Sequence, residues 1–284
     1  MNYSSQEQWT SIIKPSNGWL DIDIKELWRY RDLIMMFVKR DFVAVYKQTI
    51  LGPIWFFLQP LLTTIVFTVI FGQIAKLPTN GIPQILFYLS GTVMWNYFAA
   101  CLNTTANTFT ANVGIFGKVY FPRLVVPISV VITNMLSFGI QFILFLLLFF
   151  FFLITNSVIS PNLWIFVTPL LVLQMACLGL GCGIVISSMT TKYRDLSLLV
   201  GFSVQLWMYA TPIVYPLSMV TTPIGWLLIL NPMTAIVELF RYAFLGGQLI
   251  PLWYWGLSIV LTVLILLIGI ILFSKVEKNF MDSI

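Results

Sequence analysis

The sequence predicts an all-α polytopic membrane protein, and three observations lead to this prediction. The chain of 284 residues is 59% hydrophobic and only 9% charged, with a mean hydropathy of +0.94. A soluble domain usually has about 25% charged residues. Apolar stretches long enough to cross a bilayer recur along the chain, and nearly all Lys and Arg residues lie in the polar segments around them.

Residues 1–50 form the first predicted unit, a cytoplasmic segment whose amphipathic helix lies along the membrane surface. Residues 1–22 are polar, and a helical pattern then runs from Ile24 to Tyr46. At 100° per residue, nine apolar residues fall within an arc of about 120°: Ile24, Leu27, Trp28, Ile34, Met35, Val38, Phe42, Val45 and Tyr46. Leu33 and Phe37 lie on the opposite face, where they indicate either a docking surface for a cytoplasmic partner or internal packing.

Residues 51–284 form the second predicted unit, a transmembrane domain of six helices. The expected spans are residues 53–75, 84–108, 124–154, 162–188, 197–215 and 252–273. The third span has about 46 Å of possible helix and must tilt or protrude. In the fourth span, Gly179, Gly181 and Gly183 permit close contact with a neighbouring helix.

Between the fifth and sixth spans, proline and asparagine break the apolar sequence into short pieces. Residues 224–230 reach only about 10 Å as a helix, and residues 233–245 about 20 Å, whereas the hydrocarbon core is about 30 Å thick. We therefore expect two re-entrant helices. Non-helical backbone at that depth survives only inside protein or beside a watery cavity, which indicates a pore or gate.

The distribution of positive charge orients the chain. Six spans place thirteen of the fifteen Lys and Arg residues on one side, and only Lys76 and Arg241 lie elsewhere. Because such residues concentrate in cytoplasmic segments, both termini are predicted to be cytoplasmic. The excess of basic residues then reflects orientation, and no nucleic-acid partner is expected.

The residue types present argue against a catalytic site and against ion coupling. The chain has no histidine, and Cys101, Cys177 and Cys182 all lie in apolar segments, so no metal site is predicted. Residues 114–119 fail as a phosphate-binding loop, because the first glycine is too close to the Gly-Lys pair and no Ser or Thr follows. Of the ten Asp and Glu residues, only Glu238 lies away from the predicted cytoplasmic side. Arg241 follows three residues later on the same helix face, which favours a structural ion pair over a role in substrate binding.

Five aromatic residues lie in or beside the proline-broken segments, where they either line a path for sugars or simply pack. They are Phe56, Phe57, Trp207, Tyr209 and Tyr215. The C–H faces of sugars stack on such rings, so they are the predicted channel residues.

Several short stretches together resemble the membrane subunit of ABC-type polysaccharide exporters, which move lipid-linked O-antigen, capsule or teichoic acid chains. The stretches are residues 46–55 with Gln59-Pro60-Leu61, residues 120–123, 192–196 and 211–216, Asn231-Pro232, and residues 238–241. Their order and spacing over about residues 25–280 make the resemblance specific.

The resemblance implies a transport subunit without a catalytic site of its own. Two copies would form a homodimeric channel in the bacterial cytoplasmic (inner) membrane, on two copies of a separate subunit that binds ATP and Mg. The ATPase would press on the N-terminal helix and on residues 112–123, so the expected docking residues are Leu33, Phe37, Arg40, Lys118 and Arg123. The broken helices would form the gate, with the expected gate residues Pro212, Pro216, Asn231, Pro232, Glu238 and Arg241.

Two alternatives remain open at the level of sequence. A related ABC exporter for drugs or simple lipids would share the same number of spans. A membrane-embedded glycosyl- or acyltransferase is disfavoured, because it would require clustered Asp or His residues at a membrane face.

Overall fold

The computed structural model describes residues 24–47, 52–119, 121–155, 159–190, 193, 195–220 and 225–279. All regular secondary structure in these ranges is helical, which confirms the all-α prediction. The expectations for residues 1–22, for Lys192 and Arg194, and for residues 48–51 of the family-like stretch lie outside the described residues.

Among the described residues, five helical segments are long and apolar enough to span a bilayer, so the chain is a polytopic membrane protein. They are Trp55–Ile74, Gln84–Ala106, Val125–Thr155, Leu163–Thr190 and Leu252–Val276. Each lies within three residues of a predicted span. The first combines α3 (Trp55–Phe67) with a π-helix (Thr68–Ile74), and the fourth combines a 3-10 helix, η3 (Leu163–Val167), with α8 (Thr168–Thr190); the others are α4 (Gln84–Ala106), α7 (Val125–Thr155) and α12 (Leu252–Asn279).

Helix α9 (Leu196–Tyr209) is shorter than the predicted fifth span, which was expected to reach residue 215. Its 14 residues rise about 21 Å, less than the hydrocarbon thickness. The helix ends before Pro212 because proline disfavours helical backbone in the residue that precedes it. The chain then turns through residues 210–216.

Two short helices follow, broken at Asn231 as predicted: α10 (Gly225–Leu230) and α11 (Pro232–Leu245). The Asn231 side chain caps α11 by accepting the N–H of Met233 at 3.1 Å, and Pro232 occupies the first helical turn. Helix α11 ends at Leu245, and the next residue, Gly246, has a left-handed φ of 74° that suits glycine. Local sequence signals therefore set both ends of α11.

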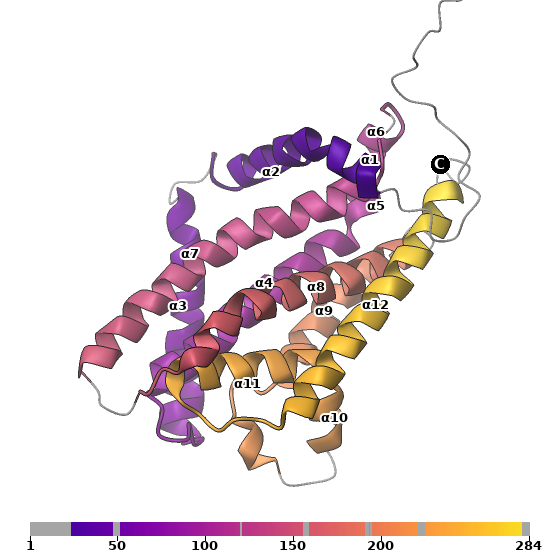
Figure 1. Ribbon diagram of the computed structural model, residues 1–284. Coiled ribbons are helices and arrows are strands. Elements are labelled where there is room, and N and C mark those ends of the chain that lie inside the picture. Colours follow the sequence, from indigo (N-terminus) through magenta and orange to yellow (C-terminus); the bar gives the residue numbers. More distant parts are fainter. Residues whose placement is uncertain are drawn as a thin grey trace, which may run out of the picture.

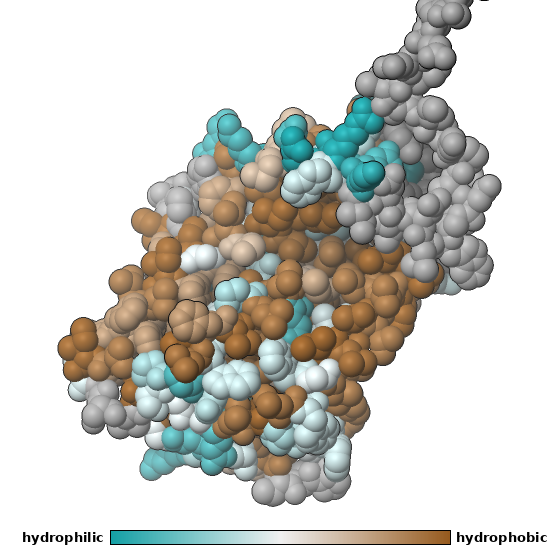
Figure 2. All heavy atoms as spheres, viewed as in Figure 1, coloured by the Kyte–Doolittle hydropathy of each residue, from teal (hydrophilic) through white to brown (hydrophobic). Residues whose placement is uncertain are grey.

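The helices form a bundle with distinct ends (Figure 1). Helices α1 (Ile24–Arg29) and α2 (Arg31–Tyr46) lie across one end, where the short α5 (Thr108–Ala111) and α6 (Val113–Phe116) are also found, while α10 and α11 lie at the opposite end. The C-terminal part of α12 returns to the α2 end, where Phe273 stacks on Phe109 with ring centroids 4.7 Å apart. Figure 2 shows a broad hydrophobic surface between hydrophilic groups at the two ends.

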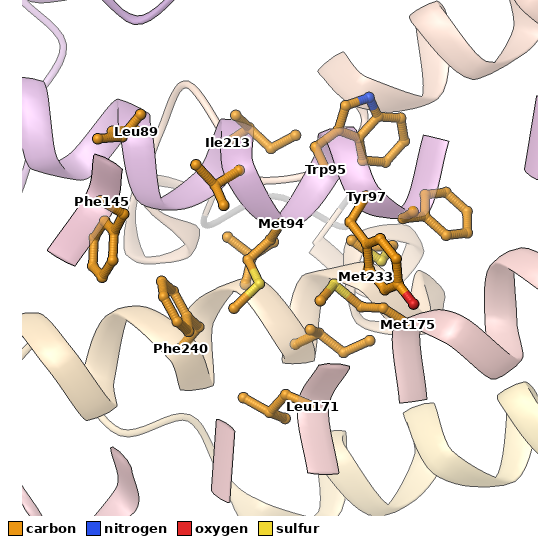
Figure 3. Close-up of a cluster of buried hydrophobic side chains, with 14 of the residues drawn as sticks. Leu89, Met94, Trp95, Tyr97, Phe145, Leu171, Met175, Ile213, Met233 and Phe240 are labelled. Carbon is orange, nitrogen blue, oxygen red and sulfur yellow. The ribbon is translucent and has the colours of Figure 1, made fainter. Parts of the chain in front are cut away.

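Helix α4 is the centre of the bundle and contacts α3, α7, α8, α9 and α11. The predicted role of the glycines is confirmed, since a Cβ on Gly179 would lie 2.7 Å from Cys101 Cβ, and one on Gly183 would lie 2.5 Å from Thr105 Cβ. Gly181 approaches the backbone of Leu266 on α12 in the same way. Figure 3 shows the core, in which side chains of α4 such as Met94 face α8 and α11.

The structure divides the predicted apolar stripe, which runs along α1 and α2. Ile34 and Val38 are buried against the chain, whereas Trp28 and Met35 are 69% and 58% exposed. Phe37, expected on the opposite face, is also buried, and its ring meets the edge of Phe121 at 5.9 Å. The structure therefore shows Phe37 in internal packing, because the segment that leads into α7 covers its ring.

Candidate functional site

The most distinctive site in the described chain surrounds the side chain of Arg241, which is 2% exposed. Its partners come from three segments that are far apart in sequence: α4, the turn after α9, and α11 itself. We call this group the Arg241 cluster. Its members are Phe87, Ser90, Pro212, Ile213, Glu238 and Arg241.

The guanidinium of Arg241 donates to three backbone carbonyls. Nη1 donates to Pro212 O at 2.5 Å, and Nη2 donates to Ile213 O at 2.7 Å and to Phe87 O at 3.2 Å. The turn at residues 210–216 leaves carbonyls without helical partners, and each would be costly in an apolar environment. Arg241 satisfies two of them and ties the turn to α4.

The charge of Arg241 is balanced within the same cluster. Nη1 also donates to Glu238 Oε1 at 3.1 Å, and Nε donates to Ser90 Oγ at 3.3 Å. The guanidinium carbon lies 3.7 Å from the centroid of the Phe87 ring, which adds a cation–π contact. The sequence prediction of an ion pair is confirmed in its geometry, and both side chains are largely buried, with 2% and 13% of the side chain exposed.

Asn231, a predicted gate residue, fastens the start of α11 to the same turn. Its Nδ2 donates to Thr211 Oγ1 at 2.8 Å and to Ala210 O at 3.2 Å. The carbonyl of the next residue, Pro232, accepts a bond from Ser258 Oγ of α12 at 2.8 Å. Of the predicted gate residues, Pro212, Asn231, Pro232, Glu238 and Arg241 therefore meet in one region, with Pro216 at the end of the same turn.

Two further polar anchors of α11 were not identified from the sequence. Gln174 on α8 donates to Ser258 Oγ at 2.7 Å and accepts from Trp255 Nε1 at 2.9 Å. Asn162 donates from Nδ2 to Tyr242 O at 2.9 Å, at the C-terminal end of α11. The available signal was an amide or hydroxyl within or beside an apolar span, which is uncommon unless it is paired.

The predicted channel aromatics do not form one group within a single chain. Phe56 stacks on Phe42 of α2, with ring centroids 6.1 Å apart. Trp207 instead packs into the α4 aromatics, 5.1 Å from Phe98. Tyr215 donates from its hydroxyl to Tyr209 O at 3.2 Å, and the Tyr209 side chain is 45% exposed. Phe57 is half-buried beside Phe56.

The predicted docking residues gather at the α2 end. Arg40 lies over the Phe37 ring at 4.6 Å and Arg123 lies over the Phe116 ring at 5.7 Å, in the same apolar cluster. Leu33 is half-buried against this cluster, and Lys118 is exposed.

These features define the class of the protein: a multi-pass helical membrane protein with a buried arginine that holds a broken helix against its central span. The chain belongs to the ABC-2 type transporter family, because the sequence model of that family matches residues 32–245. Members of this family are the transport subunits of ABC exporters and work with an ATP-binding subunit.

The chain is also similar to three proteins named "O-antigen export system permease protein RfbA". One from Klebsiella pneumoniae is 27% identical over 255 residues, covering 88% of this chain and 94% of the relative. A second from Klebsiella pneumoniae is 25% identical over 251 residues, with the same coverage. One from Myxococcus xanthus is 28% identical over 231 residues, covering 80% of this chain and 85% of the relative.

Proposed function

We propose that the chain is the permease subunit of an ATP-driven exporter that moves lipid-linked polysaccharide across the bacterial cytoplasmic membrane. The observation that carries this proposal is the extent of the similarity. The two Klebsiella relatives, named as O-antigen export permeases, are matched over 94% of their length. The family match over residues 32–245 includes the broken helices and the Arg241 cluster.

A gene deletion tests the substrate class. Cells without this protein should accumulate lipid-linked polymer on the inner leaflet, and a plasmid copy should restore its appearance at the surface. Accumulation of a small amphiphile or a drug, with normal surface polymer, would contradict the proposal and favour an exporter of drugs or simple lipids.

We further propose six crossings, with α9 and its turn as the fifth and with α10 and α11 re-entering the membrane from the outer side. Two observations support this. Helix α1 and the C-terminal end of α12 lie at the same end of the bundle, as expected for an even number of crossings (Figure 1). Helix α11 is amphipathic in sequence yet has twelve of its 14 residues buried, as a helix packed inside a bundle requires.

Both termini are then cytoplasmic, and cysteine labelling tests this. A Ser4→Cys or Ser283→Cys variant, in a background without the three native cysteines, should react with a membrane-impermeant maleimide only after the cells are opened. Labelling of either residue in intact cells would refute the orientation.

The channel is proposed to form between two copies, along α3 and α9. Val204 is the only buried residue of α9, and Leu198 and Phe202 are 82% and 61% exposed. Residues of α3 such as Leu62 and Ile65 are similarly exposed, at 49% and 46%. A Phe202→Cys variant should form disulfide-linked dimers in membranes, whereas Val260→Cys on the exposed side of α12 should not.

The separate ATPase subunit, with its ATP and Mg, is proposed to dock at the α2 end on Leu33, Arg40, Lys118 and Arg123. Closure of the ATPase would move α2 against α7 and separate α3 from α9, so that the lipid-linked head enters the path. Tyr209, Tyr215, Phe56, Phe57 and Trp207 would then line the route, and the segment held by Arg241 would form the outer gate. Leu33→Ala and Lys118→Ala should lower partner-stimulated ATP hydrolysis without changing the yield of purified permease; unchanged hydrolysis would remove the docking proposal.

A further inference from the structure

A cavity of about 520 Å³ lies at the α2 end, between α2, the end of α4, α5 and the start of α7. It is separate from the Arg241 cluster at the other end of the bundle (Figure 1). Seven of its ten lining residues are polar: Arg40, Asp41, Asn103, Thr104, Asn107, Thr108 and Asn112. The other three, Ala111, Val126 and Val130, form a small apolar wall.

The lining has no net charge. Its one cation and one anion are paired, with Arg40 Nε 2.7 Å from Asp41 Oδ1. A phosphate or pyrophosphate group would need cations that are not already neutralised by a carboxylate. The remaining polar groups are three carboxamides and two hydroxyls, which present donors and acceptors together.

From this chemistry we infer that the cavity binds a neutral sugar unit. Each sugar hydroxyl is both a donor and an acceptor, and the ring carries an apolar C–H face that fits the wall formed by Val126 and Val130. Pockets of about 300–1,000 Å³ hold drug-sized ligands, so this cavity accommodates one or two sugar rings.

Thr108 supplies an independent observation. It lines the cavity and is 1% exposed, and its Oγ1 has no hydrogen-bond partner among the described residues. A buried hydroxyl without a partner is costly. A sugar hydroxyl bound in the cavity within reach of Thr108 Oγ1 would relieve that cost.

The inference rests on the proposed function for its biological meaning. The α2 end is the proposed cytoplasmic end, so the cavity would hold the first sugars of the glycan before they enter the channel. Sugar binding itself is measured on the isolated protein, so its failure and the failure of the export proposal are distinguishable.

The four threonines at the end of α4 and in α5 provide a matched experiment. Thr104 is exposed and Thr108 is buried without a partner, and both line the cavity. Thr110 is exposed and Thr105 is buried without a partner, and neither lines it. The double variants T104V/T108V and T105V/T110V therefore each remove one exposed and one buried hydroxyl, the first pair inside the cavity and the second outside it.

The full-length protein in lipid nanodiscs is mixed with methyl α-mannoside, methyl β-galactoside and N-acetylglucosamine, and binding is measured by saturation-transfer NMR. We expect transfer to at least one sugar in the unmodified protein and in T105V/T110V, and affinity weakened about tenfold in T104V/T108V. Equal transfer in the two double variants, or none to any sugar, overturns the inference.

Inorganic pyrophosphate tests the alternative that the cavity binds phosphate groups. Its binding is measured from the broadening of its ³¹P NMR line. Asp41→Asn leaves the charge of Arg40 uncompensated, and in a sugar site it should weaken sugar binding. The inference is overturned if the unmodified protein binds pyrophosphate but no sugar, and if T104V/T108V abolishes the pyrophosphate binding. That result would show a phosphate site.

Discussion

Arg241 on α11 donates a hydrogen bond of 2.7 Å to the backbone carbonyl of Ile213, in the turn that ends α9. This bond joins two segments that the sequence separates by 28 residues. Since the same guanidinium also reaches Phe87 of α4, a single side chain holds the broken segment against the central helix. The first prediction concerns this side chain.

Arg241→Lys should destabilise the protein by about 3–5 kcal/mol, because one ammonium cannot reach the separated carbonyls and Glu238 together. The measurement is the melting temperature of purified protein, from the monodisperse fraction left after heating. Arg31→Lys is the matched control, since Arg31 is 60% exposed and lies 3.8 Å from Asp32. Equal melting temperatures for the two variants would contradict the role given to Arg241.

Gly91→Ala should strain the same cluster. The added Cβ would lie 2.8 Å from Arg241 Nη2 and 2.9 Å from Ile213 Cγ2. Overpacking of this kind costs about 1–3 kcal/mol. Gly256→Ala on α12 should be neutral or slightly stabilising, because no atom lies within 4 Å of its Cβ position. The prediction is wrong if both substitutions raise the melting temperature.

The hydrogen-bond chain from α8 through α12 to α11 should behave as one unit. Gln174→Leu and Ser258→Ala each remove a bond from the chain Trp255–Gln174–Ser258–Pro232. Single losses of about 0.5–2 kcal/mol are expected inside a membrane protein. The double variant should lose less than the sum of the two, as measured by a double-mutant cycle of stabilities. Strict additivity would show that the two residues act separately.

Phe37→Ala should weaken the attachment of α2, because the ring is 5% exposed and packs on Phe121. A loss of about 3 kcal/mol is expected for a buried phenylalanine. Trp28→Ala removes a larger side chain that is 69% exposed, and it should change the melting temperature little. A larger effect at Trp28 of α1 than at Phe37 of α2 would show that the buried face of these two helices is assigned wrongly.

Much of the fold was predictable because hydropathy and helix signals are local. Span boundaries follow from runs of apolar residues, and the break at Asn231-Pro232 follows from a capping side chain and a proline in adjacent positions. The pairing of Glu238 with Arg241 was also predictable, because residues three apart share a helix face.

The site was predictable only in part. The proline, asparagine and arginine residues of the gate were identified, but their partners Phe87 and Ser90 on α4 were not. The hydrophobic pattern of a transmembrane helix does not distinguish a residue that faces protein from one that faces lipid, since both environments favour apolar side chains. The alternative between docking and packing at Phe37 stayed open for the same reason.

The amino-acid sequence by itself determined that the chain is a helical membrane protein, where its five long apolar segments lie to within three residues, and which charged residues lie inside an apolar segment. Tertiary structure alone decided what those residues touch: that Arg241 binds the carbonyls of Pro212 and Ile213, and that Thr104 and Thr108 line one cavity with Arg40. The physical reason is that helix formation and membrane partition depend on neighbours within a few residues. Burial and hydrogen bonding between helices depend on how distant segments pack, which no local pattern specifies.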